Sequence, residues 1–202
     1  MTESAVTKAP GAHPDFFTVM GLRRRLDVDL QALEATYHRL SREVHPDFHH
    51  HKPIEERERL LAESALVNRA YRTLRDFHER VAYLIELEGG EALKPKAPPE
   101  LLADVMDTQE LLEERRAAGR IAAGHPLAAR VNQEADRFRQ RLERLEADLR
   151  ARAAEWDNVA SSNGAGADDR RRVVSALQDL LAQRVYLVNL LRDIESAQAV
   201  GA

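Results

Sequence analysis

Two ionisable side chains suited to acid–base or metal chemistry stand on either side of a proline, in the order His45-Pro46-Asp47. Proline cannot donate a backbone hydrogen bond to the preceding turn, and it moves the residue before it out of the helical conformation. The residues ahead of it have a helical pattern, so we expect His45 and Asp47 at an exposed corner where that helix ends. The sequence nearby does not offer Asp47 a paired carboxylate, a nucleophile arrangement or a ligand set. We therefore predict that Asp47 acts on a binding partner and is not a general base.

The histidines around this corner suggest a second interpretation, a metal site. His49, His50 and His51 follow His45 closely. Metal sites need fixed geometry and usually a mixture of ligand types. These histidines lie on an expected flexible loop, without cysteine and with only Asp47 in support. We therefore predict no metal and no cofactor, and stoichiometric metal retained after chelation would contradict this.

The corner is expected to be positioned by a helix on each side. Ahead of it, apolar residues recur at spacings of 3 and 4, which predicts a helix with these side chains on its buried face. They are Leu30, Leu33, Tyr37, Leu40 and Val44. Asp27 or Asp29 is suited to cap its start. A short helical turn closed by Gly21 is expected before it.

A long helix is expected to start near Pro53, which suits a first turn. Its predicted inner face is Leu60, Val67, Ala70, Tyr71 and Leu74. A fourth helix follows Phe77 and ends at Gly89-Gly90. Its predicted apolar positions are Val81, Leu84 and Ile85. The first half of the chain is thus a set of packed helices around the corner.

The outer side of the helix before the corner is basic. At about 100° per residue, His38, Arg42 and His45 fall together, opposite the apolar positions. A charged stripe is most often an ordinary solvated face. Next to the His-Pro-Asp corner, we interpret it as a docking surface for an acidic partner.

The order of these elements resembles a J-domain over about residues 15–88, including the stretch Asn68-Arg69-Ala70-Tyr71-Arg72-Thr73-Leu74. The resemblance implies binding to the ATPase domain of a DnaK-type chaperone, with the His-Pro-Asp corner triggering ATP hydrolysis. The implied chaperone-binding residues are His45, Pro46, Asp47, Arg42, His38 and Arg39. Phe48 stands where the family often has lysine, and we assign it no role.

Three prolines, Pro95, Pro98 and Pro99, stiffen the stretch after the fourth helix and indicate a linker. We predict a disordered tail at 1–14, a J-domain at 15–89, a linker at 90–99 and a second domain at 100–202.

The second half shows three helical patterns and predicts a three-helix bundle. The first pattern ends at Gly119, the second runs over about 126–159, and the third starts at Asp168 or Asp169 and runs to about Ala199. The second has heptad-like spacing at Val131, Ala135, Phe138, Leu142, Leu145 and Leu149, with Trp156 in phase. The third has one stripe formed by Val174, Leu177, Leu181, Val188 and Leu191.

Some apolar residues of the bundle miss these stripes. Leu102 and Met106 lie about 90–120° from Leu101, Val105 and Leu112 on the first helix. On the last helix Tyr186 lies opposite Leu177, and Leu190 follows one turn later. Apolar side chains on a polar face indicate a partner site. The alternative is that a small bundle buries more than one stripe, or that single exposed apolar residues carry no meaning.

The whole arrangement resembles the HscB family of J-domain co-chaperones. The supporting stretches are Asp15-Phe16-Phe17, Arg80-Val81-Ala82-Tyr83-Leu84 and Glu100-Leu101-Leu102-Ala103-Asp104-Val105-Met106-Asp107. The resemblance implies a co-chaperone that binds an IscU-type iron–sulfur scaffold and stimulates ATP hydrolysis by a DnaK-type, HscA-like chaperone, and so assists iron–sulfur cluster transfer. The implied scaffold-binding residues are Leu102, Met106, Asp107, Glu110 and Tyr186. Ala103 replaces what is often a larger apolar residue.

Composition excludes several other classes of function. The 202 residues carry a net charge of -4 and no cysteine, which gives no support for a nucleic-acid partner and excludes disulfides and thiolate metal sites. No apolar run reaches the roughly 18 residues of a membrane span, and the N-terminus lacks a signal-peptide core, so we expect a cytoplasmic protein with no membrane partner.

Three alternatives to the HscB interpretation remain. The first is a general J-domain co-chaperone whose bundle binds a different client. The second is a helical hydrolase or metal enzyme that uses the histidines around Asp47. The sequence contains no Gly-rich phosphate loop, His-Glu-x-x-His or Gly-x-Ser-x-Gly motif, so we predict that the protein is not an enzyme. The third is a structural coiled coil, which leaves the His-Pro-Asp corner unexplained.

Overall fold

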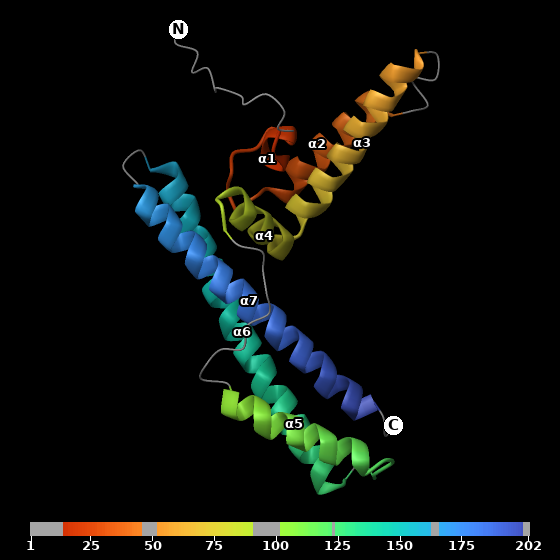
Figure 1. Ribbon diagram of the computed structural model, residues 1–202, viewed down its shortest axis with the longest axis vertical. Helices are drawn as coiled ribbons and strands as arrows, with labels where there is room; N and C mark the ends of the chain where they lie inside the picture. Colours follow the sequence, from red (N-terminus) through yellow and green to blue (C-terminus); the bar gives the residue numbers. More distant parts are fainter. Residues whose placement is uncertain (1–13, 46–51, 91–101, 123, 163–165, 200–202) are drawn as a thin grey trace. The chain divides into compact units, whose positions relative to one another are not determined.

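The computed structural model describes residues 14–45, 52–90, 102–122, 124–162 and 166–199. Every regular element in these ranges is an α-helix, which confirms the all-α prediction (Figure 1). In chain order the helices are α1 (Phe16–Val19), α2 (Leu30–Glu43), α3 (Ile54–Arg75), α4 (Phe77–Leu87), α5 (Leu102–Ala117), α6 (Pro126–Ser161) and α7 (Ala167–Ala199). Over these same ranges, no helix is both long and apolar enough to cross a bilayer.

The chain forms two compact units, Met1–Arg80 and Val81–Ala202, and the division between them falls within α4. The linker predicted at 90–99 lies almost entirely outside the described residues. The predicted domain limits therefore stay a prediction.

The single turn of α1 is fixed at both ends. The Asp15 carboxylate accepts a hydrogen bond from the Thr18 N–H at 3.0 Å, so Asp15 is the N-cap. It also accepts two hydrogen bonds from the Arg24 guanidinium, at 3.2 and 2.9 Å. Burial raises the pKa of Asp15, but these hydrogen bonds and the Arg24 charge outweigh it, so the pKa lies below its ordinary value of 3.8. Gly21, at φ 66°, ends the turn as predicted.

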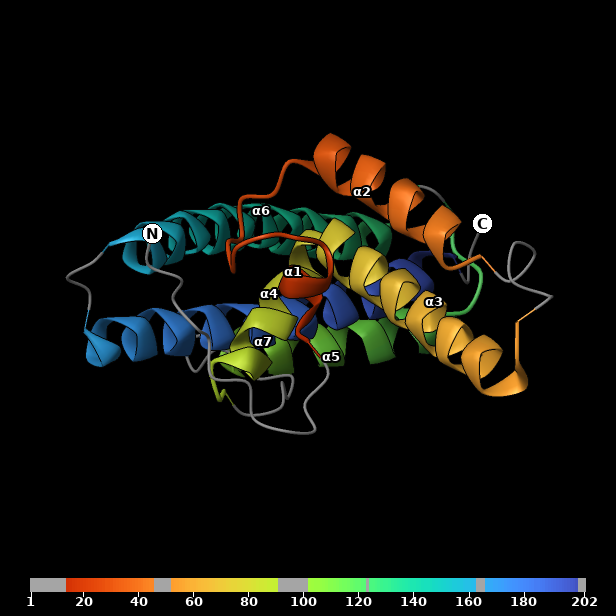
Figure 2. The same ribbon diagram turned by 90° about the horizontal axis from the view of Figure 1, so that it is seen from above.

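Helices α2 and α3 form an antiparallel hairpin that the two views show side by side (Figures 1 and 2). The Tyr37 hydroxyl on α2 donates a hydrogen bond to the Asn68 amide oxygen on α3 at 2.9 Å. The Tyr37 ring also stacks on Tyr71, with 4.1 Å between ring centroids and 13° between ring planes. These contacts fix the register of the two helices, and Asp29 caps α2 through two backbone N–H groups.

The predicted buried stripe of α2 is only partly correct. Leu33 is 1% exposed, and Tyr37, Leu40 and Val44 are half-buried. Leu30, however, is 50% exposed, so its assignment to the buried face was wrong. Leu30 is the first residue of the helix and lies about 40° from the centre of the stripe, at its edge.

Arg80, in the stretch that resembles the HscB family, is a buried structural residue. Only 5% of the surface of Arg80 is exposed. Its guanidinium donates one hydrogen bond to the Leu26 carbonyl at 3.1 Å and another to the Leu74 carbonyl. It also lies 5.8 Å from the centre of the Phe77 ring. Arg80 therefore joins α4 to the end of α3 and to the loop ahead of α2.

Replacing Arg80 with Met is expected to lower the free energy of unfolding by about 2–4 kcal/mol, because two carbonyls lose a charged donor in a buried site. Urea denaturation measures this. Arg75→Met is the matched control, since Arg75 also lies 5.8 Å from an aromatic ring, that of Tyr71, but is exposed. We expect it to cost less than about 1 kcal/mol. Equal losses in both variants would contradict the role assigned to the carbonyls.

The C-terminal unit has a core formed by α5, α6 and α7. The heptad-like prediction for α6 is confirmed, because its stripe residues are buried and Leu142 packs against them. The buried ones are Val131, Ala135, Phe138, Leu145, Leu149 and Trp156. Helix α6 packs along α7, and α5 packs on both of them. Gly119, at φ 61°, follows the end of α5.

The single stripe predicted for α7 was incomplete. Leu177 and Leu181 are buried as expected, but Leu190, assigned to a polar side, is 3% exposed, and Val188 is only half-buried. The reason is that α7 packs against α6 and also against α5. A helix that contacts two neighbours buries more than one side, which was the alternative left open from the sequence.

Candidate functional site

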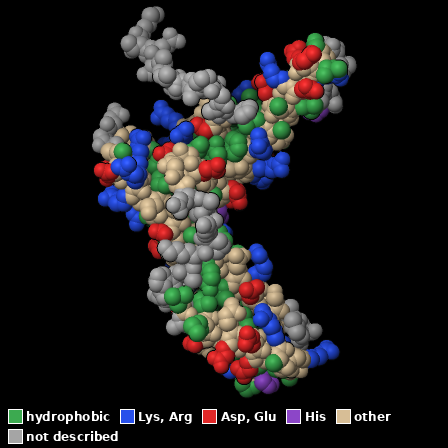
Figure 3. Space-filling view, in the orientation of Figure 1, with side chains coloured by type: hydrophobic (Ala, Val, Ile, Leu, Met, Phe, Trp, Pro, Cys, Tyr) green, Lys and Arg blue, Asp and Glu red, His purple; other side chains and the backbone are tan. Residues whose placement is uncertain are grey.

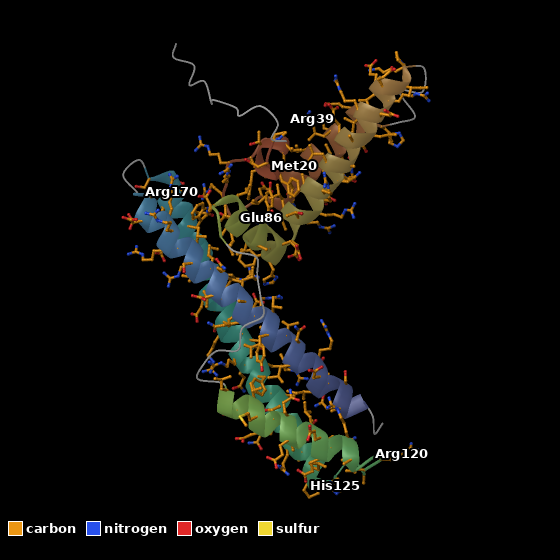
Figure 4. All side chains as sticks on the ribbon, viewed as in Figure 1. Met20, Arg39, Glu86, Arg120, His125 and Arg170 are labelled. Atoms are coloured by element: carbon orange, nitrogen blue, oxygen red, sulfur yellow. The ribbon has the colours of Figure 1, made fainter. Side chains whose placement is uncertain are left out.

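The outer side of α2 carries four exposed ionisable residues, His38, Arg39, Arg42 and His45, which we call the α2 basic face. The side chains of His38 and Arg39 are 61% and 60% exposed. Arg39 projects from α2 as labelled in Figure 4. The buried Leu33 and half-buried Leu40 on the other side of the helix hold this face outward.

Carboxylates on the same helix compensate part of this basic charge. Arg39 forms an ion pair with Glu43 at 2.9 Å, and the His38 imidazole lies 4.0 Å from Glu34. Arg42 has no carboxylate within ion-pair distance among the residues that the structure describes. Exposed ion pairs of this kind are weak and exchange readily. Arg42 is therefore the cation most available to a partner.

His45 directly follows the C-cap of α2, Val44, and is exposed. Its backbone N–H donates to the Arg42 carbonyl at 3.4 Å, so the last turn of the helix orients it. Pro46 and Asp47, the rest of the predicted corner, lie outside the described residues. His49, His50 and His51 lie there too, so the metal interpretation of this cluster stays untested. Elsewhere in the described ranges, no three His, Asp or Glu side chains are grouped to hold a metal ion.

Helix α5 presents a second exposed surface, formed by Leu102, Met106, Asp107 and Glu110, which we call the α5 face. Leu102 is 55% and Met106 73% exposed, which is unusual for large apolar side chains. Figure 3 shows hydrophobic and acidic side chains next to one another over this helix. Leu112 and Thr108, on the opposite side of α5, are buried. The structure thus places these four predicted residues on one accessible surface.

Leu111 and Leu112 pack α5 into the core, and two ion pairs join it to α6 at the surface. Asp104 pairs with Arg137 at 2.7 Å, and Glu114 pairs with Arg130 at 3.0 Å. Within the described part of the chain, Asp107 and Glu110 take part in no such pair. The α5 face therefore combines exposed apolar side chains with uncompensated negative charge, a composition that suits a partner with apolar and basic groups.

Tyr186, the fifth predicted scaffold-binding residue, has a different environment. It is half-buried and packs against the core shared by α5, α6 and α7. Burial raises the pKa of its phenol above the ordinary value of 10.0. The structure does not place Tyr186 on an exposed polar side of α7, because this helix buries several sides.

Tyr186 gives a pH-dependent prediction. Its folded pKa is raised, so its contribution to stability is complete below about pH 10 and is lost as the pH rises through the folded pKa. Tyr186→Phe is therefore expected to lose less stability than the wild type between about pH 9 and 11. Urea denaturation at a series of pH values measures this difference. The same alkaline loss in both proteins would contradict the burial of this phenol.

Comparison with known proteins shows the family to which this chain belongs. No family model matches the chain. A curated relative from Azoarcus sp. (strain BH72), the "Co-chaperone protein HscB homolog", is 38% identical over 122 residues, which cover 59% of this chain and 69% of the relative. The chain belongs to the HscB co-chaperone family. The mouse "Iron-sulfur cluster co-chaperone protein HscB" is 30% identical over 190 residues, 92% of this chain and 70% of the HscB relative.

The helical arrangement is also similar to a solved HscB structure. The chaperone HscB from Vibrio cholerae aligns with a TM-score of 0.58 over 92% of this chain and 98% of that chain. The two sequences are 20% identical, so this comparison supports the fold alone.

Sequence reasoning missed two exposed apolar residues of α3, Ile54 and Leu61, which are 62% and 54% exposed. Their spacing of seven residues was the available signal, because it places them on one side of a helix. They lie off the inner row that contains Leu60, Val67 and Leu74, all of which are buried.

Proposed function

We propose that this HscB-family chain binds an IscU-type iron–sulfur scaffold and stimulates ATP hydrolysis by a DnaK-type, HscA-like chaperone. The observation that supports this most is the presence of two chemically different exposed surfaces in two compact units. The α2 basic face belongs to Met1–Arg80, and the α5 face belongs to Val81–Ala202. In this proposal the chain itself catalyses no reaction and acts in the cytoplasm.

The N-terminal surface is assigned to the chaperone. The proposed J-domain, residues 15–89, directs His45, Pro46 and Asp47 to the ATPase, and Arg42 attracts its acidic surface. Arg39 and His38 contribute less than Arg42, since each lies near a carboxylate of its own helix. Charged side chains at the edge of an interface mainly increase the association rate.

The C-terminal surface is assigned to the scaffold. Leu102 and Met106 are suited to fill apolar pockets of the scaffold, while Asp107 and Glu110 attract its basic side chains. Tyr186 is assigned a supporting role, because it packs against the core behind α5 and is only half-buried.

The mechanism that follows is tethering. One chain binds the scaffold through its second half and engages the ATPase through its first half. The covalent connection raises the effective concentration of the scaffold at the chaperone. Each contact can then be weak and reversible, which suits the repeated delivery of a client.

The proposal is tested by offering the intact chain the scaffold and, separately, an unfolded client protein. Direct binding to the scaffold, together with faster ATP hydrolysis by the chaperone, is the expected result. Binding to unfolded clients instead, with the same stimulation, would indicate a general J-domain co-chaperone. The absence of stimulation for every DnaK-type chaperone of the host would contradict the proposal.

A further inference from the structure

Ile54 and Leu61 are exposed apolar residues of the N-terminal unit that the surfaces above leave unassigned. Both lie on α3, seven residues apart, so they are two turns apart and only about 20° apart around the helix. A single exposed apolar residue is normal and carries no argument. Two on one side of a helix form a patch, which we call the α3 apolar pair.

The α3 apolar pair lies on the half of α3 nearest the α2–α3 turn, where α2 ends. Asn68 is seven residues after Leu61, so Ile54, Leu61 and Asn68 form one row along α3. Asn68 accepts a hydrogen bond from Tyr37, which places this row along the junction with α2. His45 lies just over two turns beyond Tyr37 and about 80° further around α2, toward its outer side. Because α2 and α3 are antiparallel, His45 on α2 and Leu61 on α3 each lie about two turns from the Tyr37–Asn68 contact, in the direction of the α2–α3 turn (Figures 1 and 2). Leu61 is therefore about level with His45, and Ile54 lies about two turns further toward the α2–α3 turn.

The hairpin holds these rows in a fixed relation. The hydrogen bond between Tyr37 and Asn68 and the stacking of Tyr37 on Tyr71 join the two helices midway. A partner that engages His45 can therefore reach the α3 apolar pair on the same rigid hairpin. The two sites do not require two partners.

The charges at the edge of the pair indicate the chemistry of this partner. Arg57 lies between Ile54 and Leu61 on the side toward α2, and it is exposed. Within the described ranges Arg57 has no carboxylate at ion-pair distance. Glu58 borders the pair on the side away from α2. A partner surface that is apolar, with a carboxylate placed to meet Arg57 at the edge nearest α2, is therefore complementary to the α3 apolar pair.

We propose that the α3 apolar pair extends the chaperone-docking surface and binds an apolar, acid-edged surface of the same DnaK-type chaperone that His45 engages. This inference rests on the proposed function. It assigns the pair to affinity and leaves the triggering of ATP hydrolysis to the His-Pro-Asp corner.

The test is a titration of the intact chain against the chaperone in single-turnover ATP hydrolysis. The double variant Ile54→Gln with Leu61→Gln is expected to need at least about tenfold more protein for half-maximal stimulation, because two apolar contacts are lost. The maximal rate should stay within about twofold, since the trigger is intact. Leu61→Ala alone is expected to give a smaller shift, about threefold.

Leu30→Gln is the matched control. Leu30 is 50% exposed and lies on the same hairpin, at the start of α2 and away from the turn. Its half-maximal concentration is expected to stay within about twofold of the wild type. An unchanged value for the double variant, or an equal loss for Leu30→Gln, would overturn this inference while wild-type stimulation left the proposed function intact. A wild type without stimulation would remove both.

Discussion

Replacing His45 with Gln is expected to reduce the stimulation of chaperone ATP hydrolysis by at least about 30-fold, to near the unstimulated rate, because a central contact residue of an interface typically contributes 2 kcal/mol or more. His45 is exposed at the end of α2, so the variant should fold normally. Glutamine keeps a polar side chain of similar length but lacks the imidazole. Single-turnover ATP hydrolysis by the chaperone measures the effect.

The control is His78→Gln, the same chemical change on α4, a helix that is not part of the α2 basic face. It is expected to retain stimulation within about twofold. Scaffold binding by His45→Gln should equal that of the wild type, since the α5 face is unaltered. Loss of scaffold binding together with stimulation would contradict the separation of the two surfaces.

Replacing Leu102 and Met106 together with Ala is expected to weaken scaffold binding by about 30- to 100-fold, since two large apolar side chains would lose their contacts with the scaffold. Both residues are more than half exposed, at 55% and 73%, so their removal leaves no cavity in the bundle core. ATP hydrolysis stimulated in the absence of scaffold should be unchanged. Isothermal titration with purified scaffold measures the affinity.

Leu61→Ala is the control for this pair, because Leu61 is an exposed leucine of similar accessibility in the other unit. It is expected to leave the scaffold affinity within about twofold of the wild type. If Leu102→Ala with Met106→Ala bound the scaffold normally, the α5 face would be assigned to the wrong partner.

Much of the fold could be predicted because helical spacing encodes the side on which a helix is buried. The α6 row from Val131 to Trp156 is buried as the heptad-like spacing predicts. The ends of two helices were predicted where local chemistry defines them, at Gly119 and at Asp29, one of the two caps expected for α2. These features depend on neighbouring residues alone and need no knowledge of tertiary contacts.

The errors concern contacts between helices. Leu190 was assigned to a polar side, but α7 packs on two helices and buries it. Arg80 was noted as part of a family pattern, while its hydrogen bonds to the Leu26 and Leu74 carbonyls depend on tertiary packing. Ionic compensation within α2, such as Arg39 with Glu43, was also overlooked when its outer side was considered only as basic.

The candidate site divides in the same way. Leu102 and Met106 could be predicted as exposed, because they lie off the buried row of a well-defined helix. Tyr186 could not be placed reliably, since the several buried sides of α7 make helical phase a poor guide to exposure.

The central claim is that one chain couples scaffold binding to chaperone ATP hydrolysis. The most direct test measures single-turnover ATP hydrolysis by the chaperone with this protein, with the scaffold, and with both together. We predict that the acceleration of ATP hydrolysis with both proteins present exceeds the product of the accelerations measured with each protein alone. Leu102→Ala with Met106→Ala should remove this excess. Accelerations that simply multiply, with no excess in the wild type, would contradict the account.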